Sequence, residues 1–96
     1  MPRAIVLNAR DNVATLLDPG REGDRCTLQG EATGEVVLRQ PVPFGHKVCI
    51  RATDAGADVC KYGQVIGKAA RRLEVGEHAH IHNVESARGR GDRIGG

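Results

Sequence analysis

Residues 41–56 read PVPFGHKVCIRATDAG, and this stretch decides the fold class. A segment with two prolines and a glycine precedes the apolar run at 48–50, and the sequence Asp-Ala-Gly follows at 54–56. A short apolar run bounded by such residues is typical of a β-strand between two turns. The stretch therefore predicts a strand over residues 47–51.

The same pattern recurs along the chain, because 13 glycines and 4 prolines divide the sequence into short pieces. No segment keeps a helical period over three turns, and the apolar runs are rich in valine and isoleucine, which favour strands. We therefore predict an all-β fold, with one helical turn at most, near residues 69–73. The other predicted strands are residues 4–7, 13–17, 25–28, 35–38, 65–66 and 79–84.

The length and composition indicate one small domain. The chain has 96 residues, one Phe, one Tyr and no Trp, so its core must consist of aliphatic side chains. Its net charge is +2, with both signs interspersed, which argues against nucleic acid as a partner. We interpret the basic segment at residues 88–93 as a solvated terminus or a subunit contact. We expect a domain over residues 1–86 and a flexible, Gly- and Arg-rich tail over residues 87–96.

The sequence shows no sign of a membrane span or a leader. No run reaches the roughly 18 apolar residues that a membrane helix needs, and the N-terminal apolar stretch is too short for a signal peptide. Cys26, Cys49 and Cys60 are odd in number and lack Cys-x-x-Cys spacing. We therefore expect a cytoplasmic protein with reduced thiols that pack as small hydrophobic residues.

Three histidines alternate along residues 78–82, which read HAHIH. In a strand, His78, His80 and His82 would point outward while Ala79 and Ile81 packed inward. Neutral imidazole is a common ligand for divalent metals, but three imidazoles on a straight strand span about 13 Å, too far for one ion. We therefore expect a metal site that uses His80 and His82 and is completed from elsewhere. The alternative is an exposed polar strand edge with no ligand.

Two further clusters contain candidate binding groups. His46 and Lys47 follow a glycine, and this pair suits an anion such as a carboxylate. Lys61 precedes Tyr62, which offers an acid, a hydrogen-bond donor or a lid, and Asn83 offers both a donor and an acceptor. The sequence has no phosphate loop, no nucleophile with a base and no catalytic carboxylate pair. It therefore does not contain a complete active site.

Taken in order, three segments resemble one known family. They are PFGHKV at 43–48, KYGQVIGKA at 61–69 and VGEHAHIHN at 75–83. Together they are similar to the SAF-type small domain of altronate and galactarate dehydratases, and to the small subunits of sulfolactate sulfo-lyases. The resemblance spans nearly the whole chain and is strongest over residues 43–83.

The resemblance implies a compact β-clip fold and a part in β-elimination from an acid: dehydration of a sugar acid such as altronate or galactarate, or loss of sulfite from sulfolactate. It further implies a large catalytic dehydratase subunit as partner, a small anionic hydroxy-acid substrate, and a divalent metal, usually Fe²⁺, held mainly by that large subunit. The family positions fall on candidate catalytic residues His80, His82 and Tyr62, and on candidate substrate-binding residues His46, Lys47, Lys61 and Asn83.

The sequence leaves several alternatives open. The chain is expected to be inactive alone, since a lyase site needs the larger subunit. A binding module that captures a hydroxy acid or a metal without turnover is a second interpretation, and an assembly domain that forms a homo-oligomer is a third. Cys49 and Cys60 stand where aliphatic residues are expected, and no motif selects among the three substrates.

Overall fold

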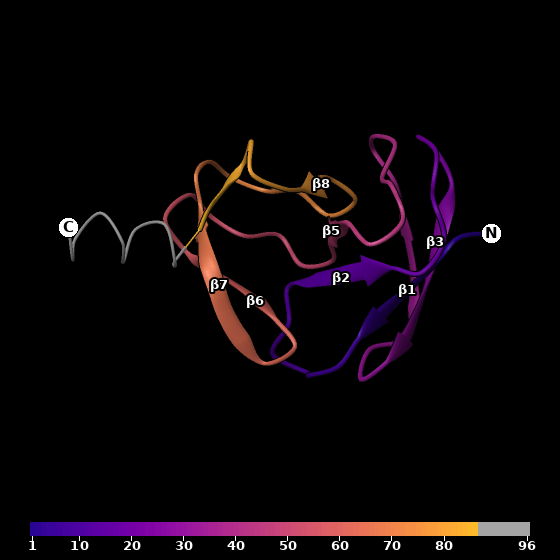
Figure 1. The fold of residues 1–96 in the computed structure, drawn as a ribbon, viewed down its shortest axis with the longest axis horizontal. Coiled ribbons are helices and arrows are strands. Elements are labelled where there is room, and N and C mark those ends of the chain that lie inside the picture. The colour runs from indigo at the N-terminus through magenta and orange to yellow at the C-terminus, as the bar shows by residue number, and fades with distance from the viewer. Residues whose placement is uncertain (87–96) are drawn as a thin grey trace.

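The computed structural model describes residues 1–86, which form nine β-strands and no helix (Figure 1). The all-β prediction is therefore confirmed. The part of the chain that the structure describes has no helix able to cross a membrane. The expected tail at residues 87–96 lies outside the described residues. The strands are β1 (Arg3–Val6), β2 (Val13–Leu16), β3 (Arg25–Gly30), β4 (Gly34–Val37), β5 (Lys47–Cys49), β6 (Asp58–Lys61), β7 (Gln64–Ala69), β8 (His78–Ala79) and β9 (Val84–Ser86).

The strands form two sheets. The larger has the order β4-β3-β1-β2-β5-β8, and the smaller has the order β6-β7-β9. Only the β1–β3 pair among these named strands is parallel; every other pair is antiparallel. In Figure 1, β6 and β7 lie at the opposite end of the molecule from β1 and β3. Strands β4 and β8 are the two edge strands of the large sheet.

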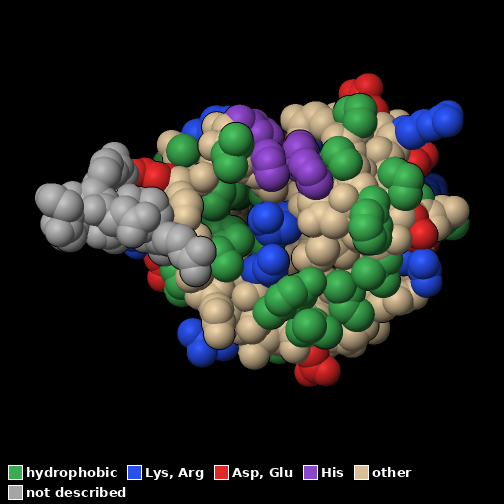
Figure 2. Space-filling model, viewed as in Figure 1, with side chains coloured by type: hydrophobic (Ala, Val, Ile, Leu, Met, Phe, Trp, Pro, Cys, Tyr) green, Lys and Arg blue, Asp and Glu red, His purple; other side chains and the backbone are tan. Residues whose placement is uncertain are grey.

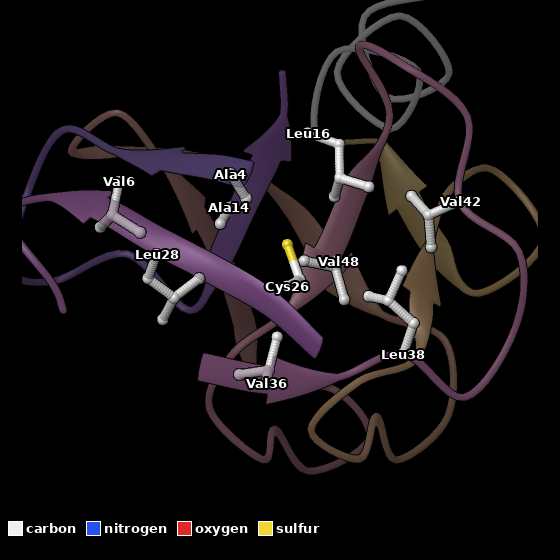
Figure 3. Packing of buried hydrophobic residues seen from close by; sticks show 10 residues of the cluster. All are labelled: Ala4, Val6, Ala14, Leu16, Cys26, Leu28, Val36, Leu38, Val42 and Val48. Atoms are coloured by element: carbon white, nitrogen blue, oxygen red, sulfur yellow. The ribbon is translucent and has the colours of Figure 1, made fainter. Parts of the chain in front are cut away.

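Two buried clusters make up the core, and strands β2 and β5 lie between them. Val48 packs in the first cluster, whose ten residues are shown in Figure 3, whereas its neighbour Cys49 packs in the second. In β2, likewise, Ala14 packs in the first cluster and Val13 in the second. Because successive side chains of a strand point to opposite faces, each of these two strands buries both faces. Aliphatic residues and cysteine supply both clusters, as the composition predicted.

The expected helical turn at residues 69–73 is wrong. Leu73 is fully buried and forms an isolated β-bridge with Thr53, with backbone N–H···O distances of 2.9 and 2.8 Å in the two directions. Arg72, next to it, pairs with Asp54 and with Glu74. Burial of Leu73 and pairing with a distant segment outweigh the local preference of this alanine- and arginine-rich stretch for helix.

The expected strand at residues 79–84 is also wrong. Strand β8 stops at Ala79, a turn follows, and a new strand, β9, begins at Val84 in the other sheet. Ala79 is buried as expected, but Ile81 is 85% exposed and does not pack inward. The other predicted strands correspond to observed ones within a few residues, while β6 was not predicted as a strand. The thiols of Cys26 and Cys49 are buried and all three cysteines are free.

Candidate functional site: a histidine cluster beside a two-lysine pocket

Strand pairing brings histidines from two distant segments together. His46 lies directly before β5, and His78 lies in β8, which pairs antiparallel with β5 so that His78 is opposite Val48. The N–H of His78 also donates to Oε1 of Gln40 at 2.8 Å. The backbone at both histidines is therefore held by the sheet and its flanking loops.

A tight turn then brings His80 to the same place. The buried side chain of Asn83 accepts a hydrogen bond from the N–H of His80 at 2.9 Å and donates one to the carbonyl of His78 at 2.8 Å. The N–H groups of Asn83 and Val84 both donate to the carbonyl of His80. Asparagine side chains commonly compete with strand pairing in this way. The turn reverses the chain, so His80 folds back towards His78 instead of continuing a straight row.

The rings of His46, His78 and His80 stack on one another, with centroids 4.4–5.4 Å apart. Nδ1 of His46 lies 2.9 Å from Nε2 of His78, and one ring nitrogen from each of the three histidines lies within 4.8 Å of the other two. His82 is exposed and meets only the ring of His78 among these contacts, tilted at 51°. Figure 2 shows the histidines gathered on one face of the molecule. The expected metal pair was His80 and His82, whereas the nitrogens that come together belong to His46, His78 and His80.

A pocket of about 240 Å³ lies beside the histidines. Its polar lining includes Lys47, Lys61 and His80, and the exposed Ile81 forms part of its rim. The remaining lining residues are Ile66, Val84 and Ser86. In Figure 2 the hollow lies next to the histidines, and Lys or Arg side chains are visible in it. The structure thus brings together Lys47, Lys61 and His80, which come from three separate sequence motifs.

The surroundings lower the pKa values of His78, His80 and Lys47. Burial is the main reason that the pKa of His78 falls to about 4, and the neighbouring histidines and Lys47 lower it further. The pKa of His80 is lowered by burial and then by His46, Lys47 and His82. Burial, and then the charge of Lys61, lower the pKa of Lys47. Two lysines this close leave positive charge that an anionic ligand would neutralise.

A hairpin with an unusual turn presents Lys61. The two turn residues between β6 and β7, Tyr62 and Gly63, have φ values of 56° and 78°, as in a type I′ turn. Tyr62 is the one non-glycine residue with positive φ in the described chain. The carboxylate of the buried Asp11 accepts hydrogen bonds from both turn N–H groups, at 2.9 and 2.8 Å. Asp11 therefore fixes the hairpin that holds Lys61.

Tyr62 lies outside the pocket lining, and Nζ of Lys61 lies 4.9 Å from the centre of its ring. Tyr62 was expected to be a catalytic residue. The structure places its ring against Lys61, a lysine of the pocket. The side chain of Asn83, which was expected to bind substrate, hydrogen-bonds to the backbone of the histidine turn. The sequence did not reveal that Asp11 holds this hairpin, because an aspartate between two predicted strands is typical of an ordinary turn.

The burial of His78 predicts a stability that depends on pH. The folded chain keeps His78 neutral down to about pH 4, whereas the unfolded chain takes up a proton near pH 6.5. The resulting stabilisation is fully present above pH 6.5 and is lost as the pH falls towards 4. Because His78 is only half-buried, we expect a loss of about 1–2 kcal/mol between pH 7 and 4.5, measured by urea unfolding with EDTA present.

Two variants check the assignment of this pH dependence. His78→Gln should flatten the fall in unfolding free energy. His82→Gln should keep most of that fall, because His82 is exposed and burial is the main cause of the lowered His78 pKa. Equal slopes in both variants would show that another group controls the titration.

Comparisons with known proteins identify the family of the chain. Residues 2–87 match the family model described as the altronate/galactarate dehydratase SAF domain. The chain is 38% identical over 82 residues to altronate dehydratase of Escherichia coli. The aligned region covers 85% of the chain but only 16% of that enzyme. It is 30% identical over 88 residues to the (2R)-sulfolactate sulfo-lyase subunit alpha of Chromohalobacter salexigens, covering 88% of the chain and 94% of that subunit.

The chain therefore corresponds to a small part of the altronate dehydratases and to nearly the full length of a sulfo-lyase subunit alpha. The match to the family model extends over almost all of the described residues, including the histidine cluster and the two-lysine pocket. The chain belongs to the SAF domain family of the altronate and galactarate dehydratases.

Proposed function

We propose that this chain is the small component of a hydro-lyase that dehydrates a sugar acid such as altronate or galactarate, and that a separate large subunit completes its active site. The observation that supports this most directly is the pocket in which Lys47 and Lys61 converge beside His80. Two ammonium groups suit the carboxylate of a hydroxy acid. Within residues 1–86 the pocket offers lysines and a histidine, and we propose that the larger subunit supplies the other groups that an elimination needs.

The proposed reaction is a β-elimination. A base removes the proton α to the carboxylate, a carbon–carbon double bond forms, and the β-hydroxyl leaves as water after taking up a proton. Lys47 and Lys61 bind the carboxylate and stabilise the negative charge that develops on it. His80, whose pKa is lowered by burial and by the groups around it, lies in the pocket wall, where it can accept a proton or bind a metal. His82 is the second candidate base, since it is exposed on the same turn.

The resemblance implies a divalent metal, and this chain has side chains that fit one. The imidazoles of His46, His78 and His80 offer three ring nitrogens close together. A bound divalent ion would act as a Lewis acid towards the developing enolate and the leaving hydroxyl. We propose that most ligands of the catalytic ion belong to the large subunit.

One observation favours a second candidate. The chain aligns with 94% of the sulfo-lyase subunit alpha of Chromohalobacter salexigens, and it is 47% identical over 53 residues to that of Paracoccus pantotrophus. In a sulfo-lyase the same elimination would release sulfite in place of water. The two-lysine pocket suits both substrates, because each is a small anionic hydroxy acid.

The deciding experiment isolates the chain with its large partner from the native host and assays the complex. Formation of a 2-keto-3-deoxy acid from altronate or galactarate would support the dehydratase, and sulfite release from (2R)-sulfolactate would support the sulfo-lyase. Galactitol, which lacks a carboxylate, is the matched negative substrate. A stable complex that turns over none of the three acids would contradict the lyase assignment.

Tyr62 provides a further prediction within this proposal. Its ring lies against Lys61, and it is absent from the pocket lining. We therefore expect Tyr62→Phe, which keeps the ring, to change kcat/KM by less than about threefold, the effect of a fraction of a kcal/mol. Tyr62→Asn also tolerates the positive φ but removes the ring, and it should raise KM more than it lowers kcat.

Steady-state assays of the complex distinguish the two roles of Tyr62. A loss of about 100-fold or more in kcat for Tyr62→Phe would show that the hydroxyl acts as a catalytic acid. Parent-like kinetics for Tyr62→Asn would show that the ring does not position Lys61.

A further inference from the structure

We infer that this chain itself contains a binding site for a divalent transition metal, formed by His46, His78 and His80. The three histidines come from two segments more than 30 positions apart and meet only through the β5–β8 pairing and the turn after it. The ions best suited to such a site are those that bind imidazole well, such as Zn²⁺, Co²⁺, Ni²⁺ and Fe²⁺.

The spacing of the ring nitrogens fits a shared ion. Nδ1 of His46 and Nε2 of His78 are 2.9 Å apart. Two nitrogens bonded to one ion at about 2.1 Å each lie roughly 3.0–3.4 Å apart in tetrahedral or octahedral geometry. The third nitrogen, from His80, lies within 4.8 Å of both, so the His80 ring has to move for all three nitrogens to bind one ion.

The backbone around the cluster is fixed, which is the second requirement for a site. The backbone carbonyl of His46 accepts a hydrogen bond from the N–H of Leu16, and the N–H of His46 donates one to the carbonyl of Pro43. Gln40 and Asn83 hold the backbone of His78, and Asn83 also holds that of His80. Ligands carried on a rigid backbone lose little entropy when an ion binds, which favours affinity.

Three protein ligands leave coordination positions open, as in catalytic sites and unlike closed structural ones. His80 also lines the pocket that contains Lys47 and Lys61, so an ion held by the three histidines would lie near the proposed carboxylate site. The lysines repel a dication, and an anionic ligand in the pocket offsets this repulsion. Metal and anion are therefore expected to strengthen each other's binding.

The competing explanation is a hydrogen bond between the two imidazoles, in which a ring N–H of His46 or His78 donates to the ring nitrogen of the other. That arrangement needs no ion and explains the 2.9 Å contact, but it gives no role to His80. Direct metal titration of the chain separates the two explanations. It needs neither the large subunit nor a substrate, so its result is independent of the proposed lyase activity.

In the experiment, the metal-free chain is titrated with Co²⁺ and followed by visible absorption, and with Zn²⁺ followed by calorimetry. We expect one ion per chain. Replacing His46, His78 or His80 by Gln should each weaken binding by about 100-fold or more, exceeding the 10–100-fold typical of groups that only support a ligand. His82→Gln, from the same turn, is the matched control and should change affinity by less than about threefold, a small part of what a ligand contributes.

Nitrogen NMR of the unmodified chain guards against variants that misfold. Zn²⁺ should shift one ring nitrogen each of His46, His78 and His80 and leave those of His82 in place. The inference is overturned if the ring nitrogens do not respond to Zn²⁺, or if His82→Gln weakens binding as much as the other three variants.

Discussion

Replacing Lys47 by alanine is expected to lower kcat/KM of the assembled enzyme by about 30-fold or more, because loss of a desolvated charge partner costs roughly 2–5 kcal/mol. Lys47 is half-buried in β5 and lines the pocket, and burial together with the charge of Lys61 lowers its pKa. A carboxylate that binds there gains most from the less solvated ammonium. Steady-state kinetics of the purified complex, with the substrate identified as above, measure the effect.

Two comparison variants make this result specific. Lys68→Ala removes a lysine of β7 whose exposed side chain pairs with Asp58, and it should leave kcat/KM within about twofold, as for other exposed ion pairs. Lys47→Arg keeps the charge but changes its shape, so it should retain more activity than alanine without restoring it fully. Parent-like kinetics for Lys47→Ala would mean that substrate does not bind in this pocket.

The resemblance and the pattern of turns predicted the all-β fold correctly, because glycine or proline lies in or beside most of the turns that end the strands. The histidine segment was predicted less well. Alternation in HAHIH favours a strand, and nothing before Asn83 interrupts it. The turn depends on the side chain of Asn83 reaching back to His78 and His80, a contact that residue spacing does not reveal. Alternation of polar and apolar residues is therefore weak evidence for a strand where an asparagine follows the alternating segment.

The position of His46 shows the other limit of the sequence. Its segment was interpreted as an anion-binding pair with Lys47, and the adjacent lysine does line the pocket. Whether His46 also joins the histidines depends on which strand lies next to β5 in the sheet. Pairing between β5 and β8 spans 30 residues, and such long-range pairing is set by the whole fold. The members of the site were therefore recognisable from the sequence, but their grouping was not.

The turn held by Asn83 gives the second large prediction, which concerns stability. Asn83 is fully buried, and both polar atoms of its side chain bond to the backbone of the histidine turn. Asn83→Ala leaves the N–H of His80 and the carbonyl of His78 without these partners and opens a small cavity. Each such loss costs about 1–3 kcal/mol, so we expect the free energy of unfolding to fall by about 3 kcal/mol. Urea unfolding measures this change.

His82→Ala is the matched control, because His82 is the exposed residue beside Asn83 in the same turn. We expect it to change the free energy of unfolding by less than about 0.5 kcal/mol. Hydrogen exchange adds a local measurement: in Asn83→Ala the amide of His80 should exchange much faster than amides of β2, since the turn opens before the core does. If the variant keeps both its stability and the protection of that amide, other contacts hold the turn. In that case the histidine cluster does not depend on Asn83.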